Sequence, residues 1–251
     1  MYEKLCAAAG SGKVKKDALL KRYTTFRIGG PADQLVNVSD ADSLKRVMAV
    51  LLEERAPYYV IGRGSNLVFD DAGFRGTVVR LCDGAGTEGF RIIEEDDESA
   101  VVYAFGGSLL SALSSYACEN ELSGLEFASG IPGSVGGGVM MNAGAYGGEL
   151  SQCVIKSCYI SAGSGAPEEG VLEGEAQRFG YRDSAYQKNG AIVTGAYFRL
   201  LKGRTRDEIA SKMRELNARR RDNSRLSFRA RAARLNAPPA ILRGGLLRLR
   251  G

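Results

Sequence analysis

Residues 59–68 read Tyr-Val-Ile-Gly-Arg-Gly-Ser-Asn-Leu-Val, and residues 130–138 read Gly-Ile-Pro-Gly-Ser-Val-Gly-Gly-Gly. Glycine allows a backbone to turn through positive φ and lets a ligand approach bare N–H groups. Successive exposed amides form a concavity that binds anions, so each glycine-rich run favours a phosphate-bearing ligand. Two such runs in one chain could hold an extended ligand from both sides, and a dinucleotide is the natural candidate.

The sequence around the first run predicts a strand, a helix and further strands. Strands are expected near residues 34–38, 58–61 and 77–81. The spacing of apolar side chains predicts the helix, which is carried by Leu44, Val47, Met48, Leu51 and Leu52. This order predicts a small α/β unit over residues 20–82, preceded by an N-terminal extension over residues 1–19.

A second unit is expected over residues 83–203. Its strands are expected near 90–93, 100–105, 154–161 and 191–200. A helix over 108–120 would turn inward Leu109, Leu113, Tyr116 and Ala117. The second glycine-rich run is expected to be a loop broken by short helical turns.

A third, incomplete unit is expected over residues 204–251. Thr205 and Glu208 form a capping box, which predicts the start of a helix. Ile209, Met213 and Leu216 would lie on one face of that helix.

Composition excludes several kinds of site. The chain has no histidine, which rules out Ser-His-Asp and Cys-His catalysis and most catalytic zinc sites. Its five cysteines are scattered and form no Cys-x-x-Cys pair, so we expect thiols in a reducing compartment and no metal site. The sequence shows no signal peptide and no run long enough to span a bilayer. These features predict a cytoplasmic protein without membrane insertion.

The net charge of +5 is carried by one end of the chain. Residues 223–251 contain seven arginines and no acidic residue, while the rest holds 27 basic and 29 acidic residues. A nucleic-acid-binding protein normally carries a basic face on its folded domain. We therefore expect no nucleic-acid partner.

Two motifs remain ambiguous when each is taken alone. The first glycine-rich run departs from a Rossmann fingerprint, because Leu67 stands where the third glycine is required. Residues 179–186 read Phe-Gly-Tyr-Arg-Asp-Ser-Ala-Tyr. Within this segment Arg182 could pair with Asp183 or with solvent, or it could hold a carboxylate through its bidentate fork.

Five motifs in series make the sequence specific, and they lie at residues 25–30, 62–67, 126–137, 142–147 and 181–184. Together they closely resemble the UDP-N-acetylenolpyruvoylglucosamine reductase family, flavoenzymes of peptidoglycan precursor synthesis. The resemblance runs from about residue 20 to residue 222 and is to the shorter subtype without an inserted substrate loop. It implies an α/β (α+β) fold with two FAD-binding domains of the vanillyl-alcohol-oxidase (PCMH) type and a C-terminal substrate-binding domain.

The resemblance also implies the reaction and the site. NADPH would reduce FAD, which would pass hydride to the enolpyruvyl group of a UDP-sugar, a step of cell wall biogenesis and so of cell shape, cell cycle and cell division. Arg182 matches the family arginine that stabilises the charge building up on the substrate carboxylate, while Asn142, Ala143 and Gly144 would lie along the flavin. The full cofactor-binding set would be Gly62, Arg63, Gly64, Ser65, Asn66, Leu67, Gly130, Ile131, Pro132, Gly133, Ser134, Gly137, Asn142, Ala143 and Gly144.

The chain departs from the family after Asp222. Where the family carries Pro-Ser-Ala-Gly-Ser-Thr-Phe-Lys with its proton-donor serine, residues 229–237 read Arg-Ala-Arg-Ala-Ala-Arg-Leu-Asn-Ala. The genetic code permits codons for these residues that read Pro-Ser-Ala-Gly-Ser-Thr-Phe-Lys-Arg when started one base earlier. We therefore expect residues 223–251 to be frame-shifted, disordered and without the donor serine, since Ser224 and Ser227 come too early. A late family glutamate would then lie beyond Gly251.

Two other classes of function stay open at the level of sequence. One is a different FAD-dependent oxidoreductase on the same two-domain scaffold, which the segment at 181–184 disfavours. The other is a non-catalytic protein that binds FAD, another nucleotide or nucleic acid, using its basic tail.

Overall fold

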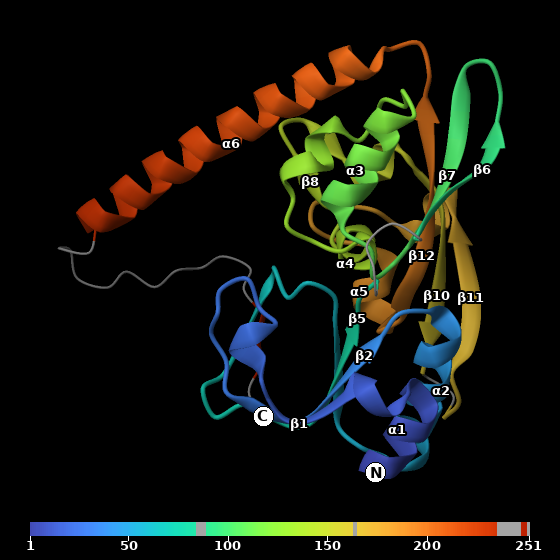
Figure 1. Ribbon diagram of the computed structural model, residues 1–251, viewed down its shortest axis with the longest axis vertical. Helices are drawn as coiled ribbons and strands as arrows, with labels where there is room; N and C mark the ends of the chain where they lie inside the picture. Colours follow the sequence, from blue (N-terminus) through green and yellow to red (C-terminus); the bar gives the residue numbers. More distant parts are fainter. Residues whose placement is uncertain (84–88, 163–164, 235–246, 250–251) are drawn as a thin grey trace.

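The computed structural model describes residues 1–83, 89–162, 165–234 and 247–249, with side chains as far as Asp222. Two α/β units lie one above the other in Figure 1, and a long helix, α6, runs along one side of the upper unit. The mixed architecture agrees with the α/β (α+β) class expected from the sequence.

The N-terminal unit is built around a four-stranded sheet of order β1-β2-β5-β3. Strand β1 is antiparallel to β2, whereas β2, β5 and β3 run parallel to one another. Its elements are α1 (Tyr2–Ala9), η1 (Ser11–Lys13), β1 (Val14–Leu19), η2 (Leu20–Arg22), β2 (Pro31–Val38), α2 (Ala41–Glu53), β3 (Tyr58–Ile61), β4 (Leu67–Phe69) and β5 (Phe74–Leu81).

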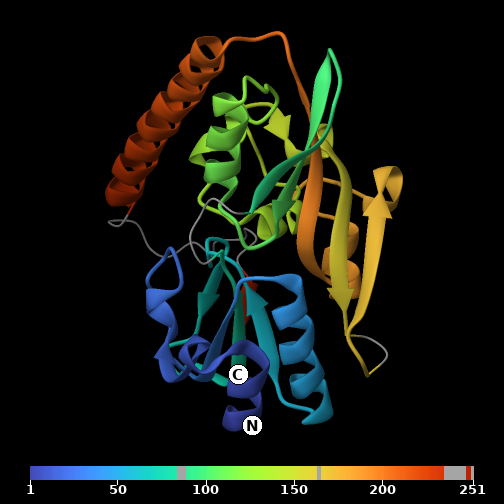
Figure 2. The same cartoon turned by 45° about the vertical axis from the view of Figure 1, so that its right-hand side comes forward.

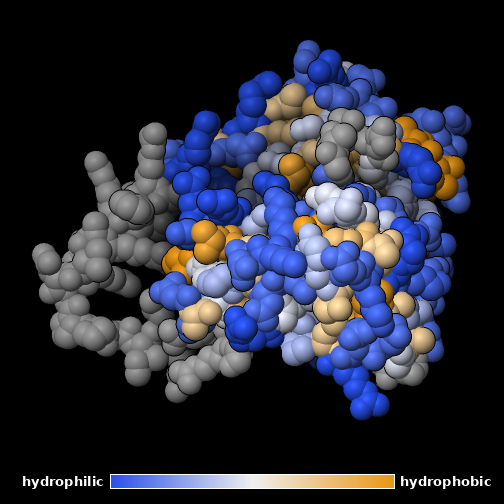
Figure 3. Space-filling model, turned by 60° about the horizontal axis from the view of Figure 1, so that its bottom comes forward, coloured by the Kyte–Doolittle hydropathy of each residue, from blue (hydrophilic) through white to orange (hydrophobic). Residues whose placement is uncertain are grey.

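Residues 1–19, expected to be an extension, form part of this unit in the structure. They supply α1 and the edge strand β1, and Leu5 is fully buried. Strand β1 reads Val-Lys-Lys-Asp-Ala-Leu, and only Val14 and Ala18 are buried, which is why no clear strand pattern marks it in the sequence. Figure 3 shows the face at this end of the molecule, where hydrophilic residues predominate.

Helix α2 forms where its apolar spacing predicts. Asp40 caps its first turn, because the Asp40 carboxylate accepts a hydrogen bond from the Ser43 amide at 2.6 Å. Along the helix the side chains of Leu44, Val47, Met48 and Leu51 are fully buried, while Leu52 is half-buried. The four fully buried side chains pack with α1 and with the sheet in one apolar cluster.

The second unit contains a five-stranded antiparallel sheet of order β11-β10-β12-β7-β6. Helix α3 packs on one face of this sheet, and Figures 1 and 2 show it on the same side as α4. Its elements are β6 (Phe90–Glu95), β7 (Ser99–Phe105), α3 (Leu110–Glu119), η3 (Glu126–Gly130), α4 (Val135–Met140), β8 (Gly144–Ala145), β9 (Gly148–Glu149), η4 (Leu150–Gln152), β10 (Val154–Ser161), β11 (Glu168–Glu173), η5 (Gly174–Gln177), α5 (Ala185–Asn189) and β12 (Ile192–Leu201).

Helix α3 is shorter than predicted and turned differently. It begins at Leu110 because Leu109 is extended, and the carbonyl of Ser108 accepts from the Val135 amide of the second glycine-rich run. Its buried residues are Leu110, Leu113, Ser114, Ala117 and Cys118, so the predicted inward positions hold only in part.

Beyond β12 the chain forms α6 (Arg206–Arg234) and β13 (Leu247–Leu249). The predicted capping box is present, since the Thr205 amide donates to Glu208 Oε2 at 2.8 Å and the Glu208 amide donates to Thr205 Oγ1 at 3.4 Å. Residues 223–251 are expected from the sequence to be disordered. In the structure, residues 223–234 are helical and residues 247–249 form a strand that pairs with β4. The remaining residues of that segment lie outside the described part of the chain.

Candidate functional site

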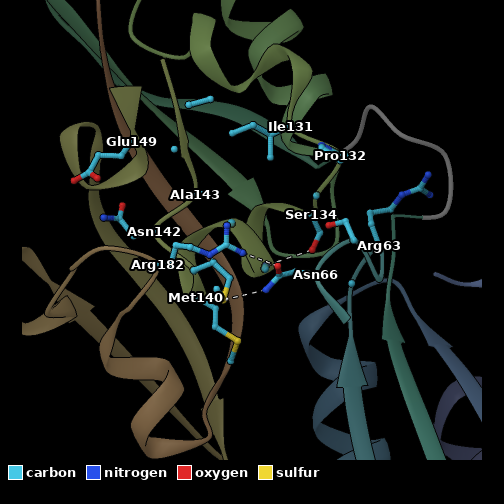
Figure 4. Close-up of a pocket in the computed structure, with 18 of the residues that line it drawn as sticks. Arg63, Asn66, Ile131, Pro132, Ser134, Met140, Asn142, Ala143, Glu149 and Arg182 are labelled. Atoms are coloured by element: carbon cyan, nitrogen blue, oxygen red, sulfur yellow. Dashed lines mark hydrogen bonds between the residues drawn. The ribbon is translucent and has the colours of Figure 1, made fainter. Parts of the chain in front are cut away.

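A cavity of about 780 Å³ is lined by both glycine-rich runs. Figure 4 shows residues of the first run, Arg63 and Asn66, on one side and Ile131 and Pro132 of the second run above them. The size falls in the range typical of sites for small molecules and cofactors. The two stretches that stood out in the sequence therefore meet at one place.

The first run follows the carboxyl end of β3, a strand in the parallel part of the N-terminal sheet. Gly64 has φ +62°, and a Cβ there would lie 2.3 Å from the carbonyl oxygen of Tyr23. The carbonyl of Gly64 in turn accepts from the amide of Thr25 at 3.0 Å. Only glycine satisfies both the conformation and the close packing at this position.

The second run begins at Gly130, the last residue of η3, and leads into α4. Ser134 caps this short helix, and its Oγ accepts from the Gly137 amide at 3.3 Å. Gly62 of the first run packs directly on Ser134, because a Cβ at Gly62 would lie 2.0 Å from Ser134 Oγ. A Cβ at Gly133 would approach Ser65 Oγ at 3.7 Å. The two runs therefore pack closely against each other, because glycine lacks the side chain that would keep them apart.

The cavity offers unused backbone donors and an excess of positive charge. Among the hydrogen bonds found for the described residues, none uses the backbone N–H of Gly64, Ser65, Asn66 or Ser134. Its charged lining residues are three arginines, Arg63, Arg182 and Arg220, and one glutamate, Glu149. Free amides and arginines together suit a pyrophosphate, so the residues present fit a dinucleotide such as FAD.

Arg182 lies in the cavity wall and reaches the opposite unit. Its Nη2 donates to Asn66 Oδ1 at 2.6 Å, as Figure 4 shows. Asp183 instead pairs with Lys188 at 3.4 Å, so the Arg182–Asp183 pairing considered from the sequence is not found. Arg182 therefore presents its guanidinium to the cavity, where an anionic group could replace the Asn66 amide as its partner.

Asn142 has a different environment from the other predicted cofactor residues. It is buried, and its Nδ2 donates to the Gly180 carbonyl at 3.1 Å. Its Oδ1 accepts from the Ser151 amide at 2.9 Å. Because both ends of the amide bind the protein's own backbone, the side chain fastens the loop that precedes Arg182.

Nearly all predicted site residues line the cavity. Only Gly130 is absent from the lining; it ends η3, where a Cβ would lie 2.4 Å from Asn217 Oδ1 of α6. The structure adds lining residues that the motifs did not single out for ligand binding: Tyr59, Val60, Ile61, Gly138, Met140, Met141, Ala145, Tyr146, Gly147, Gly148, Glu149, Gln152, Tyr181 and Arg220. Burial raises the pKa of the Tyr59 hydroxyl. Arg220 could have been noticed in the sequence, because it lies in a run of three arginines at the end of the matched region.

Other chemistries find no support in the described part of the chain. It contains no group of three or more metal-binding side chains. None of its helices combines the length and apolar character that crossing a bilayer requires. All five cysteines are free, and burial raises the pKa of the Cys153 thiol to about 12, so that thiol stays neutral at ordinary pH.

Comparison of the sequence with known proteins agrees with the cavity's chemistry. Residues 32–163 match a family model described as an FAD binding domain. A UDP-N-acetylenolpyruvoylglucosamine reductase of Clostridioides difficile is 38% identical over 247 residues, which cover 98% of this chain and 78% of that protein.

Solved structures show the same relationship. The UDP-N-acetylenolpyruvylglucosamine reductase of Thermus caldophilus superposes with a TM-score of 0.64 at 37% identity, covering 83% of this chain and 70% of that one. p-Cresol methylhydroxylase superposes with a TM-score of 0.53 at 18% identity, covering 81% of this chain and 43% of that one. The second likeness concerns the fold alone, and it agrees with the fold of the vanillyl-alcohol-oxidase (PCMH) type expected from the sequence.

Proposed function

Since the chain belongs to the UDP-N-acetylenolpyruvoylglucosamine reductase family, we propose that it binds FAD and serves the NADPH-dependent reduction of UDP-N-acetylglucosamine enolpyruvate to UDP-N-acetylmuramate. This makes it a flavoprotein oxidoreductase of peptidoglycan precursor synthesis. The observation that carries the proposal is the position of Arg182 in the wall of a cavity that both glycine-rich runs line. A cytoplasmic location and a link to cell division follow from the same proposal.

The residues of the two runs would hold the cofactor. FAD, when bound, supplies hydride transfer between the nicotinamide and the substrate. The free amides of Gly64, Ser65, Asn66 and Ser134 would donate to its phosphates, and the arginines of the lining would balance their charge. Gly130, at the end of η3, would not touch the cofactor; its missing side chain would let Asn217 and Arg220 of α6 approach closely.

Arg182 would hold the substrate carboxylate. Its guanidinium is planar and can bind a carboxylate through two parallel hydrogen bonds. In the structure one guanidinium nitrogen is held by Asn66, and that neutral partner is weaker than a carboxylate would be. Arrival of the enolpyruvyl acid would exchange this contact for an ion pair, and the same ion pair would stabilise negative charge that develops there during reduction.

A comparison of two ligands tests this role of Arg182. The FAD-loaded chain is titrated with the enolpyruvyl sugar and with UDP-N-acetylglucosamine, which lacks the carboxylate, while the flavin absorption spectrum is followed. We expect Arg182→Gln to weaken binding of the first ligand by about tenfold or more and to leave the second unchanged. Equal effects on both ligands would show that Arg182 does not recognise the carboxylate.

The C-terminal segment lacks the serine motif from which the family's proton donor comes. Residues 223–251 hold only two serines, Ser224 and Ser227, and neither falls in the family's donor motif. We therefore infer that this chain binds FAD but reduces the enolpyruvyl sugar poorly. Steady-state oxidation of NADPH in the presence of the sugar measures this, and turnover above about 1 per second would overturn the inference.

A shifted reading frame explains that segment and can be tested directly. Sequencing the gene across codons 218–251 and beyond shows whether another frame reads Pro-Ser-Ala-Gly-Ser. If it does, a corrected base restores a full reductase, whereas a confirmed shift means that this copy is impaired. If no frame restores the motif, the alternatives gain: a different FAD-dependent oxidoreductase, which would oxidise an alcohol in air without NADPH, or a non-catalytic nucleotide-binding protein.

A further inference from the structure

The backbone of Arg182 has an unusual conformation. Its φ is +52°, in the left-handed region that residues with a side chain rarely occupy. In the more common extended conformation the chain would direct the side chain elsewhere, so the position of the guanidinium depends on keeping this φ. Asn142, which fastens Gly180, acts two residues earlier. Something must also hold the backbone after Arg182.

Gln187 makes that contact. Its Nε2 donates to the carbonyl of Arg182 at 2.7 Å and to the carbonyl of Met140 at 3.2 Å. Both hydrogens of the amide group are thus donated, one to the Arg182 carbonyl and one to the carbonyl of Met140, a residue of the cavity lining. Ser184 Oγ donates to the same Met140 carbonyl at 2.7 Å. The segment is therefore tied to a fixed point at the end of α4.

Helix α5, which carries Gln187, is itself anchored in the core. Tyr186 is fully buried, and its hydroxyl lies 2.7 Å from Ser157 Oγ of β10. Ser157 also donates to Gln177 Oε1, so three buried side chains share one hydrogen-bond network. Because neighbouring residues of a helix point in different directions, Tyr186 fixes the helix while Gln187 remains exposed beside the Arg182 peptide.

We propose that Gln187 is a positioning residue that holds the left-handed backbone of Arg182 and thereby aims its guanidinium into the cavity. The positioning of Arg182 by Gln187 is inferred from the hydrogen bonds alone. Its role in recognising a carboxylate rests on the proposed function. Gln187→Glu is the sharpest change, because it keeps the size of the side chain and sets a carboxylate oxygen against two carbonyl oxygens. Gln187→Met removes the donors without adding charge and serves if the first variant folds poorly.

A first experiment measures how readily the backbone at Arg182 opens, and it needs no ligand. Trypsin cuts after arginine where the chain opens locally, so cleavage of the Arg182–Asp183 bond, followed by mass spectrometry, reports the freedom of this segment. We expect Gln187→Glu to raise the rate of this cut about fivefold or more, and to leave the cut after Arg199 of β12 unchanged. The matched control is Asn189→Asp, which adds the same charge to α5 and keeps the oxygen that accepts from the Ala191 amide.

A second experiment measures whether the Arg182 guanidinium still recognises a carboxylate. The FAD-loaded chain is titrated with the enolpyruvyl sugar and with UDP-N-acetylglucosamine. Gln187→Glu should weaken only the carboxylate ligand, by roughly tenfold, and Gln187→Lys, which keeps donors for both carbonyls, should restore binding to within about threefold.

The two experiments separate failure of this proposal from failure of the proposed function. Equal cutting at Arg182 in Gln187→Glu and in the unaltered chain overturns the positioning role, whatever the ligand does. If Arg182→Gln leaves the preference for the carboxylate ligand unchanged, the proposed function fails, while the proteolysis still decides the role of Gln187. If Arg182→Gln abolishes the preference but Gln187→Glu and the Asn189→Asp control both keep it, Gln187 does not aim the guanidinium.

Discussion

Gly62→Ala is expected to destabilise the protein by forcing the two glycine-rich runs apart. The new methyl would lie 2.0 Å from Ser134 Oγ and 2.9 Å from Ser134 Cβ, and these are the atoms it would meet within 4 Å. Overpacking of this kind costs about 1–3 kcal/mol. If Ser134 rotates away instead, its cap on α4 is lost, at about 1 kcal/mol.

The expected net loss follows from these terms. Gly62 is not among the residues with positive φ, so alanine adopts its backbone conformation and regains about 0.4–1 kcal/mol through the unfolded state. The free energy of unfolding should therefore fall by about 1 kcal/mol, which for a chain of this size lowers the melting temperature by roughly 2–4 °C. FAD affinity should fall as well, because both runs line its cavity.

A double-mutant cycle with Ser134→Gly decides whether this contact is the cause. Glycine at 134 removes both clashing atoms, and as a helix cap it costs only a few tenths of a kcal/mol. In that background Gly62→Ala should stabilise the protein by about 0.5 kcal/mol, giving a coupling energy near 1.5 kcal/mol from denaturant unfolding. Additive effects of the two substitutions would refute the reasoning.

Three further predictions concern the cap, the pH and the tail. Burial alone would raise the pKa of the Asp40 carboxyl, but hydrogen bonds from Ser43 lower it, so this stabilisation is present above pH ~4 and is lost as the pH falls further. Asp40→Ala should lower the free energy of unfolding by about 1 kcal/mol at pH 7 and by less at pH 3, as urea titrations would show. Because burial raises the pKa of Cys153 to about 12, against about 8.5 when unfolded, stability should fall as the pH rises above ~9, and Cys153→Ala should flatten that decline. Deleting residues 223–251 should leave FAD binding unchanged within about threefold by fluorescence titration, because the described lining ends at Arg220; a large loss would assign the tail a role in the cofactor site.

The sequence predicted α2 and two of the strands closely. Helix α2 has four fully buried residues at helical spacing, and strands β3 and β10 have the predicted bounds. Strand β11 reads Glu-Glu-Gly-Val-Leu-Glu, and it exists because β10 offers it a partner rather than because its own residues favour a strand. Edge strands such as β1 and β11 expose most of their side chains, so they lack the alternation on which prediction depends.

The site was predictable in its composition but not in its contacts. Glycine spacing alone indicated two backbone cradles, and the structure confirms that both line one cavity. The approach of Arg182 to Asn66 joins residues 116 positions apart, and nothing local in either motif specifies it. Asn142 lines the cavity as expected, but the motif did not show that its side chain also binds the backbone of Gly180 and Ser151.

The cavity is lined by residues of both units, and this has a consequence for cooperativity. The second unit has its own apolar core, and the junction with the N-terminal unit is packed by Ile160 and Ile192 of its sheet. A ligand held by both runs adds its binding free energy to that junction, while it adds little to the interior of either unit. Amide hydrogen exchange should therefore resolve two separately opening units without FAD and a single cooperative unit with it. In this protein, bound cofactor would couple the unfolding of two units that open separately without it.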